Sequence, residues 1–186
     1  MKHVLDYDAW ILDEGVLSVP WKELDPSSDV KTFGVILEDP KNPLHPSILR
    51  NTRSALQKFA LAGHRLTPLA TEFDKDILSS STMTAMTVFA MDPEKTPIGF
   101  VARGNEPPIP SIATTAVPGL ARIKPNINGV FHLSAEVNRI QAKFRKAVVE
   151  KNLDAILMPP YQATAVPHDT FGVPVYGILA NLLDVS

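Results

Sequence analysis

The order of apolar and polar positions predicts a strand, a helix and a second strand in the first half of the chain. Residues 32–38 form a short apolar run rich in β-branched and aromatic side chains, which is typical of a buried strand. From Pro46 to Gly63 the apolar residues recur at helical spacing, and the glycine suits a left-handed helix end. A second extended run ends at residue 69. Residues 32–69 therefore predict a right-handed βαβ unit.

Two further helices and a third strand follow from the same patterns. Residues 71–90 predict a helix that Thr71 can cap, with one apolar stripe that contains Phe73, Ile77, Met83, Met86 and Phe89. Ser134 can cap another helix, which a left-handed Asn152 would end; its apolar face contains Leu133, Val137, Ile140, Phe144, Ala147 and Val148. Residues 154–158 then predict a buried strand. Helices that alternate with strands indicate an α/β fold.

The remaining segments show no regular period. Residues 1–31 predict an extended N-terminal arm that contains Pro20-Trp21, and residues 96–130 predict a proline-rich irregular segment. Residues 131–186 combine a helix, a strand and a closing loop. We therefore interpret the 186 residues as one partial domain rather than several domains.

Charge and composition exclude several classes of protein. Lysine and arginine number 18 and aspartate and glutamate 20, so the net charge of −2 offers no basic patch for nucleic acid or an acidic membrane surface. The absence of cysteine excludes disulfide scaffolds and thiol nucleophiles. There is no apolar run of about 20 residues and no leader pattern at the start. We expect a cytoplasmic protein that binds neither nucleic acid nor membrane.

Glycine and histidine are placed in ways that argue against a cofactor or a metal. The chain has nine glycines, no two of them adjacent, so neither a phosphate-binding loop nor a Gly-Gly-Ser oxyanion loop is present. None of the five histidines lies at metal-ligand spacing from another. We expect no cofactor and no metal.

His168-Asp169 is the most interesting dipeptide for chemistry. It follows a predicted strand, where α/β proteins place their ligands. The alternative is that both side chains only tie down their loop through hydrogen bonds to the backbone, and we favour that alternative on the residues alone.

Three serines and two carboxylates are weaker candidates. Ser79-Ser80-Ser81 lies four residues after Lys75, but within a predicted helix and without the glycine turn that exposes a nucleophile. We interpret these serines as part of a helix. Glu38-Asp39 could reach a site, but a turn that ends the preceding strand is the favoured interpretation.

The closing residues of the chain resemble the amidase signature family, specifically its fungal-type acetamidases and general amidases. The resemblance rests on LDAILMPP at 153–160, AVPHDTFGVP at 165–174 and NLLD at 181–184. Weaker likenesses precede these in the family's order: Pro20-Trp21, FGVI at 33–36 with His45-Pro46, Ala62-Gly63-His64, and GNEPP at 104–108. The match extends along the whole chain but corresponds to the C-terminal part of the family domain.

The resemblance implies a fold and a reaction. The fold is an α/β/α sandwich with a mixed central sheet, incomplete in this chain. The reaction is hydrolysis of a carboxylic amide to a carboxylate and ammonia or an amine, by a serine whose proton passes through a second serine, in a cis peptide bond, to a lysine. None of these groups can be assigned to a residue here, so the resemblance implies a truncated fragment that is inactive alone and has no catalytic residue. It implies a substrate-pocket loop at His168, Asp169, Thr170, Phe171 and Gly172.

Several alternatives stay open at this point. The chain is an incomplete part of a longer amidase that binds a small amide, a subunit completed by a partner chain, or a non-catalytic domain, derived from an amidase, that binds small molecules or proteins. If sheet neighbours are missing, we expect low solubility and self-association through exposed sheet edges.

Overall fold

A computed structural model describes residues 7–13, 15–16, 30–69, 72–73, 76–107, 109–110 and 119–183. The chain divides into two compact units, Met1–Val30 and Lys31–Ser186. In the first unit, a 3-10 helix at Ala9–Ile11 (η1) replaces part of the extended arm that the sequence predicts. Pro20 and Trp21, which carry that prediction, lie outside the described residues.

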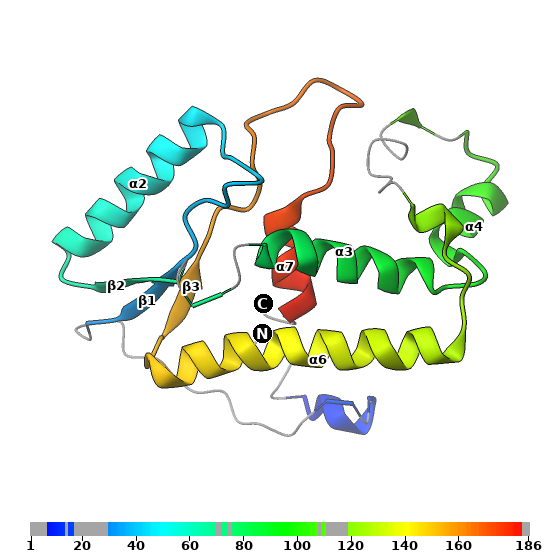
Figure 1. The fold of residues 1–186 in the computed structure, drawn as a ribbon, viewed down its shortest axis with the longest axis horizontal. Coiled ribbons are helices and arrows are strands. Elements are labelled where there is room, and N and C mark those ends of the chain that lie inside the picture. Colours follow the sequence, from blue (N-terminus) through cyan, green and yellow to red (C-terminus); the bar gives the residue numbers. More distant parts are fainter. Residues whose placement is uncertain are drawn as a thin grey trace. The chain divides into compact units, whose positions relative to one another are not determined.

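The second unit contains a sheet of three short parallel strands, β1 (Thr32–Val35), β2 (Arg65–Pro68) and β3 (Ala155–Leu157) (Figure 1). Their order is β2-β1-β3, so β1 is the central strand. Phe33 pairs with Leu66 of β2 on one side and with Ala155 of β3 on the other. The βαβ unit predicted over 32–69 is present, with strands shorter than the sequence predicts.

Helix α2 (Pro46–Leu61) connects β1 to β2. The ring of His45 accepts a hydrogen bond from the backbone N–H of Ser47 at 3.2 Å, and Pro46 occupies the first turn, where no N–H donor is needed. Gly63 follows the helix with φ = 90°, which confirms its expected left-handed conformation. The ring of Phe59 lies 5.1 Å from that of Phe33, so α2 packs on the sheet.

The main core lies beside the sheet, among helices α3 (Ile77–Ala90), α6 (Ile127–Glu150) and α7 (Val175–Leu183). Helix α7 packs against both α3 and α6 (Figure 1). The largest fully buried side chains come from these helices and from the residues that follow β2 and β3: Leu69, Leu78, Ser81, Ile140, Pro159, Tyr176 and Leu179. Among the described residues, none of the helices has the length and apolarity that crossing a bilayer requires.

The helix starts differ from the sequence predictions. Helix α3 begins at Ile77 rather than at Thr71, which lies outside the described residues. Helix α6 begins at Ile127, well before Ser134, because the side chain of Asn126 caps it by accepting a hydrogen bond from the N–H of Gly129 at 2.8 Å. The predicted end holds, since Asn152 adopts φ = 48°.

The prediction of an irregular segment over 96–130 is wrong at both ends. The first part of this segment is helix α4 (Thr96–Arg103). Its last part contains η2 (Leu120–Arg122) and the first residues of α6. The carboxylate of Asp92 starts α4 by accepting hydrogen bonds from the N–H groups of Thr96 at 2.7 Å and Glu94 at 3.0 Å. These bonds lower the pKa of Asp92, those from Thr96 most of all.

The apolar stripe predicted for residues 71–90 is only partly covered. Ile77 is buried, and the ring of Phe73 stacks on that of Phe144 of α6 at 4.0 Å. Met83 and Phe89, however, are 47% and 70% exposed. The half of α3 nearest its C-terminus thus presents apolar side chains to solvent.

Gly34 sits where the central strand meets two leucines, and its substitution tests that packing. A Cβ at Gly34 would lie 2.7 Å from the Cδ1 atoms of both Leu69 and Leu153, which are buried. We expect Gly34→Ala to lower the free energy of unfolding by about 1–3 kcal/mol through overpacking. Gly172→Ala is the matched control, because no atom lies within 4 Å of its Cβ position. Urea denaturation would contradict this packing if both variants were equally stable.

Candidate functional site

Two loops leave the carboxyl edge of the sheet next to one another, where α/β folds bind ligands. One loop follows β1 and the other follows β3, the parallel neighbour of β1. The backbone N–H of Ile36 donates to the carbonyl of Leu157 at 3.0 Å, and that of His45 donates to the carbonyl of Gln162 at 2.7 Å. The loops are thus joined at two points.

The turn after β1 is held by the buried phenol of Tyr176, which α7 carries. Its hydroxyl accepts a hydrogen bond from the N–H of Asp39 and donates one to the carbonyl of Asn42, both at 3.0 Å. The carboxylate of Asp39 accepts from the N–H of Lys41 at 2.6 Å, and that of Glu38 accepts from the N–H of Leu44 at 2.9 Å. Both carboxylates close the turn, which confirms the interpretation favoured from the sequence.

Burial raises the pKa of Tyr176, since the phenolate would lose its hydration. The hydrogen bond from Asp39 opposes that shift, whereas the negative charges of Asp39 and Glu38 add to it. Tyr176 is therefore a neutral structural donor and acceptor at physiological pH.

The stem of the loop after β3 is fixed by side chains on both of its sides. The ring of Tyr161 stacks on that of Phe171 at 4.6 Å, with 19° between the ring planes, and its hydroxyl accepts from the N–H of Gly172 at 3.4 Å. The side-chain amide of Gln162 donates to the carbonyl of Val173 at 2.9 Å. The sequence analysis missed Tyr161 and Gln162. The aromatic residues at 161 and 171, which flank the loop, were the available signal.

The tip of this loop is a tight exposed turn. The N–H and the hydroxyl of Thr170 both donate to the carbonyl of Pro167, at 3.2 and 2.7 Å, and Asp169 has φ = 63°. Of the five residues predicted for the pocket loop, the structure brings Phe171 and Gly172 to Tyr161. It leaves His168, Asp169 and Thr170 exposed. That the five residues line a substrate pocket stays a prediction.

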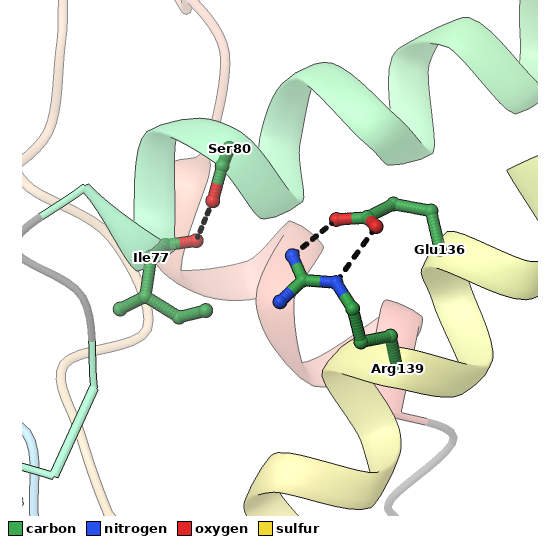
Figure 2. A network of polar contacts seen from close by, with 4 residues as sticks. All are labelled: Ile77, Ser80, Glu136 and Arg139. Atoms are coloured by element: carbon green, nitrogen blue, oxygen red, sulfur yellow. Dashed lines mark hydrogen bonds and ion pairs between the residues drawn. The ribbon is translucent and has the colours of Figure 1, made fainter.

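The serine run lies in the first turns of α3, as the helix interpretation requires. Ser79 accepts a hydrogen bond from the side-chain amide of Asn42 at 3.2 Å, and Ser80 donates to the carbonyl of Ile77 at 3.2 Å (Figure 2). Ser81 is fully buried, and its hydroxyl has no partner among the described residues. Lys75 lies outside the described residues. Among the described residues, none of these three hydroxyls is hydrogen-bonded to a basic or acidic side chain.

The side chains of Glu136 and Arg139 on α6 form a two-point ion pair, with bonds of 2.6 and 2.8 Å (Figure 2). The hydrogen bonds from Arg139 lower the pKa of Glu136. Within the described part of the chain, no three histidine, aspartate or glutamate side chains gather into a potential metal site.

Comparison with the sequences of known proteins shows which family the chain is related to. The chain is 32% identical over 194 residues to an amidase of Gibberella moniliformis and 28% identical over 199 residues to an acetamidase of Emericella nidulans. These matches include 99% and 100% of the chain. The chain is a partial member of the amidase signature family.

The partial amidase chain spans about a third of the length of the curated relatives it matches, 34% and 35%. The solved structure of a fatty acid amide hydrolase matches 98% of the chain with a TM-score of 0.85, at 20% identity and over 32% of its own length. That likeness confirms the α/β fold of the family. A comparison with models of known protein families finds no match.

The hydroxyl of Tyr176 can be removed without changing the shape of the ring. We expect Tyr176→Phe to lower the free energy of unfolding by about 1–3 kcal/mol, because the N–H of Asp39 loses its acceptor in a buried site. Tyr161→Phe is the matched control, since its hydroxyl makes one long bond in a half-buried position. Equal stability of the two variants in urea would show that the buried hydroxyl does not stabilise the turn.

The raised pKa of Tyr176 also predicts how stability depends on pH. In the unfolded chain tyrosine ionises near pH 10, whereas the folded chain retains the proton to higher pH. The stability that the neutral phenol contributes is therefore complete below about pH 10 and is lost as the pH rises through the folded-state value. We expect Tyr176→Phe to lose less stability than the natural chain between pH 8 and pH 11. Parallel curves of unfolding free energy against pH would contradict this assignment.

Proposed function

We propose that this chain supplies the scaffold and one wall of the substrate pocket of an amide hydrolase, which converts a carboxylic amide to a carboxylate and ammonia or an amine. The observation that carries the proposal is the similarity of the whole chain to an amidase and an acetamidase, together with the fold of a fatty acid amide hydrolase.

In this proposal the loop after β3 contacts the acyl group of the amide. Its stem is held by the stacked rings of Tyr161 and Phe171 and by the bond from Gln162 to Val173, so the loop presents one conformation to a ligand. Phe171 remains 42% exposed and offers an apolar ring face. His168 and Asp169, at the exposed tip, would meet the polar end of the substrate or the leaving amine.

We further propose that the catalytic groups lie outside these 186 residues. The resemblance calls for two serines, a lysine and a glycine-rich oxyanion loop, and the chain has no adjacent glycines. Its run of three serines lies in α3, where the hydroxyls of Ser79 and Ser80 are bonded to Asn42 and to the helix backbone. The chain alone would then have no group that attacks an amide and no donors for the oxyanion.

A non-catalytic role as a binding domain is the second candidate. It is favoured by an open groove of about 510 Å³ on the outer side of α2, which is lined by apolar and polar side chains that include Leu49, Arg50, Arg53 and Gln57. Such a groove could hold a small molecule without any chemistry.

Activity measurements distinguish the two candidates. We expect no hydrolysis of acetamide or an aryl amide by the isolated chain. We expect hydrolysis by a chimera in which the chain replaces the matched segment of the Gibberella moniliformis amidase. In the chimera, Phe171→Ala should raise KM for an aryl amide about fivefold, since an aromatic contact is worth about 1 kcal/mol.

Val149→Ala is the control in the chimera, because Val149 is exposed on α6 and is not part of the loop after β3. A folded chimera without activity would favour the binding role. Turnover by the isolated chain would show that this chain carries its own nucleophile, and Ser79→Ala would test whether it is Ser79.

A further inference from the structure

An apolar groove of about 230 Å³ lies between the end of α3 and the start of α6. Five of its six lining residues are apolar: Val88, Met91, Val130, Leu133, Ser134 and Val137. The two helices are close here, since a Cβ on Gly129 would lie 3.2 Å from the Cε of Met91. Phe89 and Phe131, the chain neighbours of two lining residues, are 70% and 69% exposed. We call these eight residues the α3–α6 face.

The face continues an apolar seam along α6. Apolar residues recur on this helix at alternating intervals of three and four, at Val130, Leu133, Val137, Ile140, Phe144 and Ala147. That spacing places all six on one side of a helix. The last three are buried in the core of this chain, whereas Val130 is 45% exposed. Val137 also packs against the core and Leu133 is half-buried, so the seam is open at its N-terminal end, at Val130, and covered along the rest.

Exposed apolar side chains are normal when they are scattered, but a contiguous patch marks an interaction site. Here the patch and the buried core belong to the same side of the same helix. Among the described residues, the N-terminal end of the seam is therefore an apolar surface that is only partly covered.

We propose that the α3–α6 face is the docking surface for the rest of an amidase domain, an apolar surface contributed by sequence outside these 186 residues. This inference rests on the proposed function. Its support is the length of the relatives: this chain corresponds to 34% of the Gibberella moniliformis amidase and to 32% of the fatty acid amide hydrolase chain, at a TM-score of 0.85. In each, about twice as much further chain accompanies the matched part.

Cysteine labelling can report whether the face is covered, because the natural chain has no cysteine. Val130→Cys places a thiol in the groove. Lys146→Cys is the matched control on the same helix, because Lys146 is exposed. It lies sixteen residues after Val130, so its side chain leaves the helix in a direction rotated by about 160° around the helix axis from that of Val130. Both variants would be labelled with a thiol reagent in the isolated chain and in the chimera described above, and the rates read at the labelled peptide by mass spectrometry.

We expect both thiols to react at similar rates in the isolated chain. In the chimera, the thiol at position 130 should react at no more than about a tenth of that rate, because access limits thiol reactions. The thiol at position 146 should keep its rate. Equal labelling of position 130 in a chimera that hydrolyses amides would overturn the docking surface and leave the proposed function standing. Protection in a folded but inactive chimera would support the surface and contradict the function.

The isolated chain provides a second test. Protection of position 130 there would overturn the proposal, and light scattering would then show whether a second copy or another segment of the same monomer covers the face. Val130→Glu should leave the thermal midpoint of the isolated chain within about 2 °C, since the groove is open. A fall of more than about 5 °C would place the groove in the core of this chain and would also overturn the proposal, even if the chimera were insoluble.

Discussion

The hydroxyl of Tyr176 joins parts of the second unit that lie far apart in the sequence. It accepts from Asp39 and donates to Asn42, across 137 and 134 positions of the chain, and it does so in a fully buried site. Leaving a buried polar atom without its hydrogen bonds costs stability, so these bonds favour one relative placement of α7 and the turn after β1. The position of the turn after β1 also sets the position of His45, whose backbone N–H donates to the carbonyl of Gln162 in the loop after β3.

This constraint explains why the region at the carboxyl edge of the sheet is ordered although most of its residues are in loops. Each loop is fixed by side chains that satisfy backbone groups, as Glu38 does for Leu44 and Gln162 for Val173. The result is a rigid frame around an exposed tip. Such a frame suits a pocket wall, because a ligand does not have to order the loop when it binds.

Local signals in the sequence predicted much of this architecture. The βαβ unit, the left-handed residues Gly63 and Asn152, and the helix around Ser79 follow from short-range patterns of apolar and capping residues. The starts of α4 and α6 were missed because the prolines nearby indicated irregular chain, whereas the side chain of Asn126 caps α6 and that of Asp92, four residues before α4, accepts from the first N–H of that helix. The Tyr161–Phe171 stack was missed, because the two aromatic residues that flank the loop after β3 meet only when the loop closes on itself.

The placement of β1 between β2 and β3 has a consequence for the time course of folding. Val35 pairs with Pro68 within a short stretch of chain, but on its other side it pairs with Leu157, 122 residues later. At a synthesis rate of about 5–20 residues per second, one edge of β1 waits roughly 6–24 s on the ribosome for its partner. Both strands of the β1–β2 pair are therefore synthesised well before β3, which pairs with the other edge of β1. During that interval the nascent chain exposes an unpaired edge that a chaperone, or another nascent chain, can reach.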